Sequence, residues 1–145
     1  MSVKRTFHGT CHCGALKVDY ESAKDPAKTT VRECQCSFCR LHAAKAVSDP
    51  DGTLRFTEQT AGALNRYVFG LRTAEFLTCH TCGAYMGCIL TDGDAAWGIV
   101  NIRTLADGAT FTAPPTAADY DAETTAARIT RRKAMWTPAE ILPAS

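Results

Sequence analysis

Residues 79–83 read CHTCG, in which two cysteines are separated by two residues and followed directly by a glycine. A second pair, Cys11 and Cys13, is likewise followed by Gly14. A glycine at such a position has no Cβ, so the backbone amides can turn toward the sulfurs. Four thiolates from two tight turns match the tetrahedral set with which zinc holds a fold together. We therefore expect one closed structural zinc site formed by Cys11, Cys13, Cys79 and Cys82.

Three more cysteines stand close together in the stretch CQCSFCR at residues 34–40. One loop and the first turn of a helix can present Cys34, Cys36 and Cys39 to a single ion, and no fourth cysteine lies in that stretch. A zinc ion with three protein ligands keeps an open position, where an incoming thiol can bind and lose its proton near neutral pH. The sequence thus predicts a second zinc site, and this site is the candidate reaction centre.

Two other side chains could change this division. His42 lies three residues after Cys39 and could complete a closed site of three cysteines and one histidine, which would make both zinc sites structural. Cys88 could also be a ligand, but its neighbours in YMGCIL (residues 85–90) favour a small thiol in the core. An iron–sulfur cluster also uses thiolates, yet the spacing does not reproduce a ferredoxin pattern.

Composition narrows the class of protein. The chain has 145 residues, 16 basic and 15 acidic, for a net charge of +1, so no global field favours nucleic acid or an anionic membrane. The first residues lack the apolar core of a signal peptide, and no apolar run approaches the roughly 18 residues of a spanning helix. We expect a soluble cytoplasmic protein whose thiols stay reduced, which favours metal sites over disulfides. Motifs for serine, phosphoryl or hydride chemistry are absent from the sequence.

Hydrophobic patterning predicts a mainly β protein. Residues 15–21 alternate apolar and polar side chains, as a half-buried strand does. We expect one domain over residues 1–145, with a body at about 5–112 and a helical tail at about 118–145 after Pro114 and Pro115. Further strands are expected at 53–56, 66–69, 75–78, 85–90 and 96–101, and helices at 37 to about 46 and about 119–135.

The tail is acidic at its start and basic at its end, which complements a helix dipole. The basic residues are Arg128, Arg131, Arg132 and Lys133. They are explained by a solvated helix end, although the same cluster could hold a carboxylate or a phosphate.

Three blocks together, GTCHCGA (9–15), CQCSFCR (34–40) and CHTCG (79–83), resemble the signature of the glutathione-dependent formaldehyde-activating enzyme and centromere protein V family. The resemblance covers roughly residues 5–105. It implies a small Mss4-like β fold with a structural zinc and a second zinc on the loop of Cys34, Cys36 and Cys39. That agrees with the division of the cysteines into four and three.

The resemblance also implies glutathione binding and the joining of its thiol to formaldehyde, which gives S-hydroxymethylglutathione. This is carbon–sulfur bond synthesis or, in reverse, a lyase reaction. Arg40 is a candidate partner for a glutathione carboxylate. Ser37 could cap the helix or bind a ligand, and His42 is a candidate for substrate binding. The stretch LHAA at 41–44 departs from the family's more usual basic residue and glycine, so another small thiol adduct is open as the substrate.

A non-enzymatic zinc module is the second class of function that the family allows. Such a module would bind a partner through the basic tail, as the centromere protein V side of the family suggests. The near-neutral charge argues against it, because chromatin or tubulin binders usually carry broad basic or complementary tracts.

Overall fold

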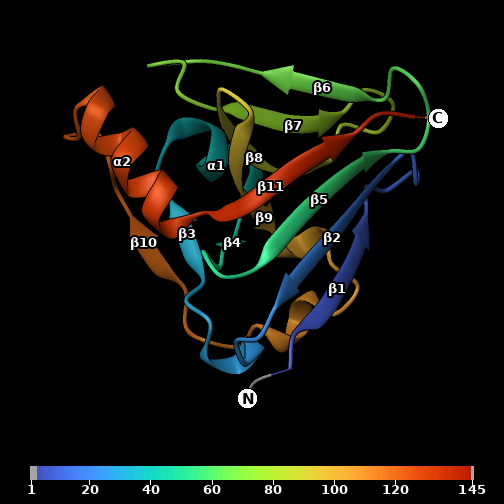
Figure 1. Cartoon of the computed structure of the whole chain (residues 1–145), viewed down its shortest axis with the longest axis horizontal. Helices are drawn as coiled ribbons and strands as arrows, with labels where there is room; N and C mark the ends of the chain where they lie inside the picture. The colour runs from blue at the N-terminus through green and yellow to red at the C-terminus, as the bar shows by residue number, and fades with distance from the viewer. Residues whose placement is uncertain (1–2, 145) are drawn as a thin grey trace.

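The computed structural model describes residues 3–144 and confirms that the chain is mainly β. Its strands form one mixed sheet (Figure 1). They are β1 (Arg5–Thr10), β2 (Leu16–Ser22), β3 (Arg32–Cys34), β4 (Ala46–Val47), β5 (Thr53–Glu58), β6 (Leu64–Tyr67), β7 (Glu75–Cys79), β8 (Tyr85–Asp92), β9 (Ala95–Asn101), β10 (Thr116–Ala118) and β11 (Thr137–Leu142). The helices are α1 (Ser37–His42) and α2 (Thr125–Met135), with short 3-10 turns at Pro26–Lys28, Ile102–Thr104 and Gly108–Thr110.

Strand β2 shows how the sequence pattern builds the sheet. Its residues alternate between buried and half-buried, as the apolar and polar alternation predicts. Val18 pairs with Gly9 of β1 on one side and Phe56 of β5 on the other, both in antiparallel register. Val18 and Phe56 are buried in the same hydrophobic cluster. The other edge of β5 takes β11 as a parallel neighbour, so these four strands lie side by side in Figure 1.

Strand β9 is the branch point of the sheet. One edge of β9 pairs with β8 along its length, and the sheet continues from β8 to β7 and β6. The other edge pairs with β11 and then with β4, from which the sheet continues to β3 and β10. This branching brings the end of β7 near the turn between β1 and β2, although the two are far apart in sequence.

The C-terminal region differs from its expected helix. The helix α2 begins at Thr125 rather than near Asp119, because the Thr124 hydroxyl accepts a hydrogen bond from the Ala127 amide and caps it. It ends before Pro138, since the residue before a proline avoids the helical region. The last part of the expected tail is instead β11, which fills a central place in the sheet.

Other helices and strands also differ from their expected boundaries. The helix α1 ends at His42 instead of about Ala46, because Ala43 adopts a left-handed conformation (φ 49°) that stops the helix. Strands β3, β4 and β10 are two or three residues long, too short for a periodic pattern, and β1 faces the core with only Phe7 and Gly9. Within the described residues, no helix is both long and apolar enough to traverse a lipid bilayer.

Candidate metal centres

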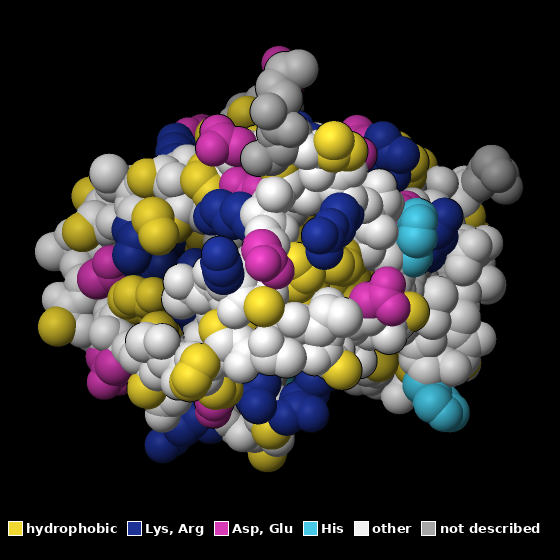
Figure 2. Space-filling view, turned by 90° about the horizontal axis from the view of Figure 1, so that it is seen from below, with side chains coloured by type: hydrophobic (Ala, Val, Ile, Leu, Met, Phe, Trp, Pro, Cys, Tyr) yellow, Lys and Arg dark blue, Asp and Glu magenta, His cyan; other side chains and the backbone are white. Residues whose placement is uncertain are grey.

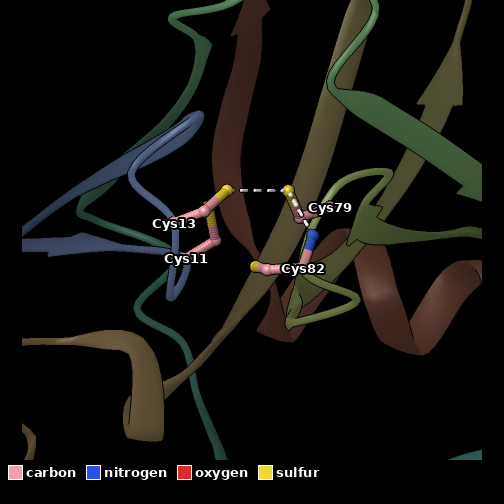
Figure 3. A group of neighbouring side chains, drawn as sticks. All are labelled: Cys11, Cys13, Cys79 and Cys82. Carbon is pink, nitrogen blue, oxygen red and sulfur yellow. Dashed lines mark hydrogen bonds between the residues drawn. The ribbon is translucent and has the colours of Figure 1, made fainter.

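The first cysteine cluster joins two turns of the sheet. Cys11 and Cys13 lie in the turn between β1 and β2, while Cys79 ends β7 and Cys82 lies in the turn before β8. All four sulfurs lie within 4.8 Å of one another and point toward a common centre (Figure 3). The Sγ atoms of Cys11 and Cys13 are 3.7 Å apart, and those of Cys13 and Cys79 are 3.6 Å apart.

These separations fit a zinc ion. A tetrahedral ion with Zn–S bonds of about 2.3 Å holds its sulfurs about 3.8 Å apart. The two glycines have the role that their positions suggested, because Gly14 (φ 83°) and Gly83 (φ 80°) both take the left-handed conformation that closes each turn. Backbone amides approach the sulfurs as expected, with the Leu16 amide donating to Cys11 Sγ at 3.2 Å. The structure thus contains a four-thiol set that suits a closed metal site.

The thiols of this cluster compete for protons. Desolvation alone would raise the pKa of Cys82, but hydrogen bonds from the amides of Ala84 and Cys13 and from neighbouring thiols lower it to about 6. The Ala15 amide lowers the pKa of Cys13, yet desolvation and the neighbouring thiols together raise it to about 11. Four adjacent thiols therefore cannot all ionise at neutral pH unless a cation balances their charge.

The second cluster lies where β3 meets α1. Cys34 ends β3, Cys36 is the residue before α1, and Cys39 lies in its first turn; their sulfurs also fall within 4.8 Å of one another. Hydrogen bonds from the thiols of Cys34 and Cys39 lower the pKa of Cys36 to about 2, whereas contacts with Cys34 and Cys36 raise the pKa of Cys39. Cys34 and Cys36 are half-buried and Cys39 is buried. This group could also hold a metal ion, with three protein sulfurs rather than four.

His42 does not join this group. Its Nδ1 atom is 2.9 Å from the Phe38 carbonyl oxygen, and its ring packs on Phe38 with 4.3 Å between ring centroids. The set of ligand atoms within 4.8 Å of one another holds only the three cysteines, among the residues that the structure describes. The closed alternative with histidine as the fourth ligand is therefore not the arrangement found.

The expected role of Ser37 as the helix cap is wrong. Cys36 is the capping residue, and its Sγ accepts the hydrogen bond from the Cys39 amide at 3.4 Å. The sulfur does what a hydroxyl does at other helix starts. Ser37 and Arg40 are both exposed on α1 near the cluster. Cys88 is 1% exposed among apolar neighbours, which confirms its place in the core.

An open cleft of about 600 Å³ lies beside α1. Its lining combines aromatic, polar and basic side chains from α1, β6 and β7: Phe38, Leu41, His42, Asn65, Arg66, Tyr67 and Thr78. Leu41 and Tyr67 are 83% and 52% exposed, so this wall presents apolar surface to solvent. No sequence motif predicts the contribution of β6 to this cleft, because that contribution depends on the pairing of β6 with β7.

A smaller cavity lies against the sulfurs of the second cluster. Cys34 and Cys39 line it together with Arg131 and Arg132 of α2 and Arg32 of β3. Burial lowers the pKa of Arg32 and of Arg132, although a guanidinium stays charged in proteins. The simple expectation of a solvated basic helix end is wrong for Arg131 and Arg132, because the branched sheet places this helix over β3.

Comparisons with known proteins add one relative of known structure. The crystal structure of a Rhodobacter sphaeroides protein, a structural genomics target, superposes with a TM-score of 0.55 at 33% sequence identity. The alignment covers 75% of this chain and 99% of that chain. No family model matches the sequence, and no curated protein matches it.

Proposed function

The chain belongs to the same family as this Rhodobacter sphaeroides protein, and we propose that it is a zinc-dependent enzyme that makes or breaks a carbon–sulfur bond on a glutathione-type thiol. The proposal is also supported by the resemblance of the three cysteine blocks to those of the glutathione-dependent formaldehyde-activating enzymes. Its simplest reaction is the addition of the glutathione thiol to formaldehyde, which gives S-hydroxymethylglutathione.

The contrast between the two cysteine clusters carries this proposal. Four sulfurs converge in the first cluster and three in the second, where His42 is turned to the Phe38 carbonyl instead. Two zinc ions per chain would then differ in role, one closed and structural, the other with room for a substrate. A zinc ion in the three-cysteine cluster would supply a binding position for a thiol and lower the pKa of that thiol.

The residues around the second cluster could hold the remainder of the substrate. The cleft beside α1 has a volume of about 600 Å³, room for a small peptide, with Phe38 and Tyr67 as apolar walls. Arg66, which lies 3.5 Å from Glu75, supplies a cation for a carboxylate. Arg40 is exposed on the same helix and stays a candidate for the second carboxylate. When the substrate sulfur attacks the aldehyde carbon, a C–S bond forms, and the C=O π electrons move to the oxygen, which takes a proton.

The alternative of a partner-binding module has less support. Arg131 donates to both carboxylate oxygens of Glu123, Arg128 lies 3.6 Å from the same carboxylate, and Lys133 pairs with Asp92. These pairs offset much of the basic tail on which that function would depend. In Figure 2, basic and acidic side chains are interspersed on the face shown, as on an ordinary protein surface.

The test combines metal analysis with adduct exchange. Purified protein should hold about two zinc ions per chain, and Cys36→Ala should lose one while it stays folded. NMR exchange spectroscopy of glutathione and formaldehyde should show faster adduct exchange with wild type than in buffer, and no acceleration with Cys36→Ala. His12→Ala is the matched control, because His12 is exposed beside the other cluster and ligates nothing there. Exchange no faster than in buffer with wild type would refute the formaldehyde reaction.

A further inference from the structure

The small cavity beside the second cysteine cluster joins sulfur ligands to guanidinium groups. It encloses about 50 Å³, room for a group of a few heavy atoms. Cys34, Cys39 and three arginines, Arg32, Arg131 and Arg132, line it together with mainly apolar side chains. None of the described residues that line it is acidic, and it shares no lining residue with the cleft beside α1. It is therefore a compartment separate from the cleft beside α1, and it borders the second cysteine cluster.

Two of the three arginines have only neutral partners in the described part of the chain. Arg32 donates from Nη2 to the Ser48 hydroxyl at 2.7 Å. Arg132 donates from Nη1 to the Thr73 hydroxyl at 2.7 Å, and its guanidinium lies 4.8 Å from the centre of the Trp136 ring. No carboxylate forms a salt bridge with either in residues 3–144.

The remaining hydrogen-bonding capacity of Arg132 also points to an absent partner. Its Nε atom is buried and has no hydrogen-bond acceptor. Arg131, by contrast, is neutralised by the two-oxygen pair with Glu123 at 2.8 and 3.0 Å. Buried charges and buried donors are costly without partners, so the cavity is a place where an anionic oxygen ligand would be stabilised.

We propose that this cavity receives a carboxylate attached to the carbon that bonds the substrate sulfur, so that the carbonyl partner is a small 2-oxo acid rather than formaldehyde. The proposal rests on the proposed thiol site at Cys34, Cys36 and Cys39. A purely electrostatic role toward the thiolates would need no hollow space, whereas here the arginines and the sulfur-bearing residues line a common cavity.

The position of the cavity selects this carboxylate over those of glutathione itself. A group within it lies directly beside Cys34 and Cys39, and so close to a sulfur bound at their cluster. The carboxylates of glutathione are many bonds from its sulfur and fit the open cleft instead. In the reaction, the thiol sulfur bonds to the keto carbon, the C=O π electrons move to oxygen, and that oxygen takes the thiol proton. The carboxylate is unchanged, and no oxidant or reductant is required.

The test uses two small thiols that differ in one group. Mercaptoacetate carries a carboxylate next to the carbon that bears sulfur, and mercaptoacetamide carries a neutral amide of the same shape. Isothermal titration calorimetry of the metal-loaded full chain gives both affinities, each corrected for the ionised fraction of the thiol. Wild type should prefer the acid by roughly tenfold or more, the usual effect of a charged hydrogen bond.

Variants at the arginines show which side chains cause the preference for the acid over the amide. Arg132→Met and Arg32→Met should each reduce the acid preference toward one and leave the affinity for the amide unchanged. Lys133→Met should keep the full preference, because Lys133 is on the same helix but pairs with Asp92 outside the cavity. Zinc content and circular dichroism establish that each variant is folded.

Three other results would overturn either the carboxylate site or the thiol site. No acid preference in wild type would overturn the proposal even if a variant failed to fold. Loss of both ligands in folded Arg132→Met would also overturn it, because the arginine would then act on the thiolate and not on the carboxylate. If neither thiol binds wild type, the thiol site itself fails, and the proposed function fails with it.

Discussion

Replacing Cys82 by serine should destabilise the protein about twice as much as replacing Cys36 by serine, although both side chains are half-buried. The reason is the length of chain that each metal would close. The first cluster joins Cys13 to Cys79, 66 positions apart. A cross-link over such a loop raises the free energy of the unfolded state by about 4 kcal/mol, because it removes conformational entropy from the unfolded chain. The outermost cysteines of the second cluster, Cys34 and Cys39, are five positions apart, for which the same relation gives about 2 kcal/mol.

Thermal unfolding of zinc-loaded samples measures the difference. At about 2–4 °C per kcal/mol for a chain of this size, Cys82→Ser should lower Tm by roughly 8–16 °C and Cys36→Ser by roughly 4–8 °C. Zinc analysis accompanies each scan, and each variant should lose one of two ions. Equal losses of Tm, or a greater loss for Cys36→Ser, would show that the second cluster holds the fold as firmly as the first and refute the division of roles.

Cys88→Val should change the free energy of unfolding by less than about 1.5 kcal/mol, as a similar-sized core substitution does; loss of zinc in metal analysis would instead make Cys88 a ligand. Glu123→Gln should lower stability by up to about 1 kcal/mol at pH 7. The hydrogen bond from Arg131 lowers the pKa of Glu123, so this contribution is present above the ordinary pKa and lost as pH falls through the folded-state value. In urea denaturation, a Glu123→Gln difference that stayed constant down to acid pH would contradict this pairing. Gly9→Ala should cost about 1–3 kcal/mol or more in the same assay, because its Cβ would lie 2.2 Å from the Thr104 carbonyl oxygen; wild-type stability would show that the strand can shift.

The parts of the fold that the sequence predicts are those with a local signal. The alternation in β2 needs only the chain's own period, and the two glycine-ended cysteine turns have geometry fixed within four or five residues. β11 has no such signal. It follows directly after the end of α2 and is a strand because β5 and β9 both have free edges with which it pairs. Those edges are formed by distant parts of the sequence.

The metal clusters follow the same rule. The CQCSFCR stretch places three sulfurs together by local geometry, so its grouping could be predicted from spacing alone. The role of Ser37 could not, because a sulfur in Cys36 takes the capping position one residue earlier. The arginine-lined cavity depends on α2 reaching β3 through the sheet, and no spacing between Arg32 and Arg132 indicates that contact.

The central place of β11 has a consequence for synthesis on the ribosome. Strands β5 and β9 are both made before residues 137–142 emerge. Until then, the edges of β5 and β9 that later pair with β11 have no strand between them. Both cysteine clusters, by contrast, are complete once Cys82 has left the exit tunnel. Metal can therefore tether the early part of the nascent chain while the sheet is still open, and the last strand then closes it.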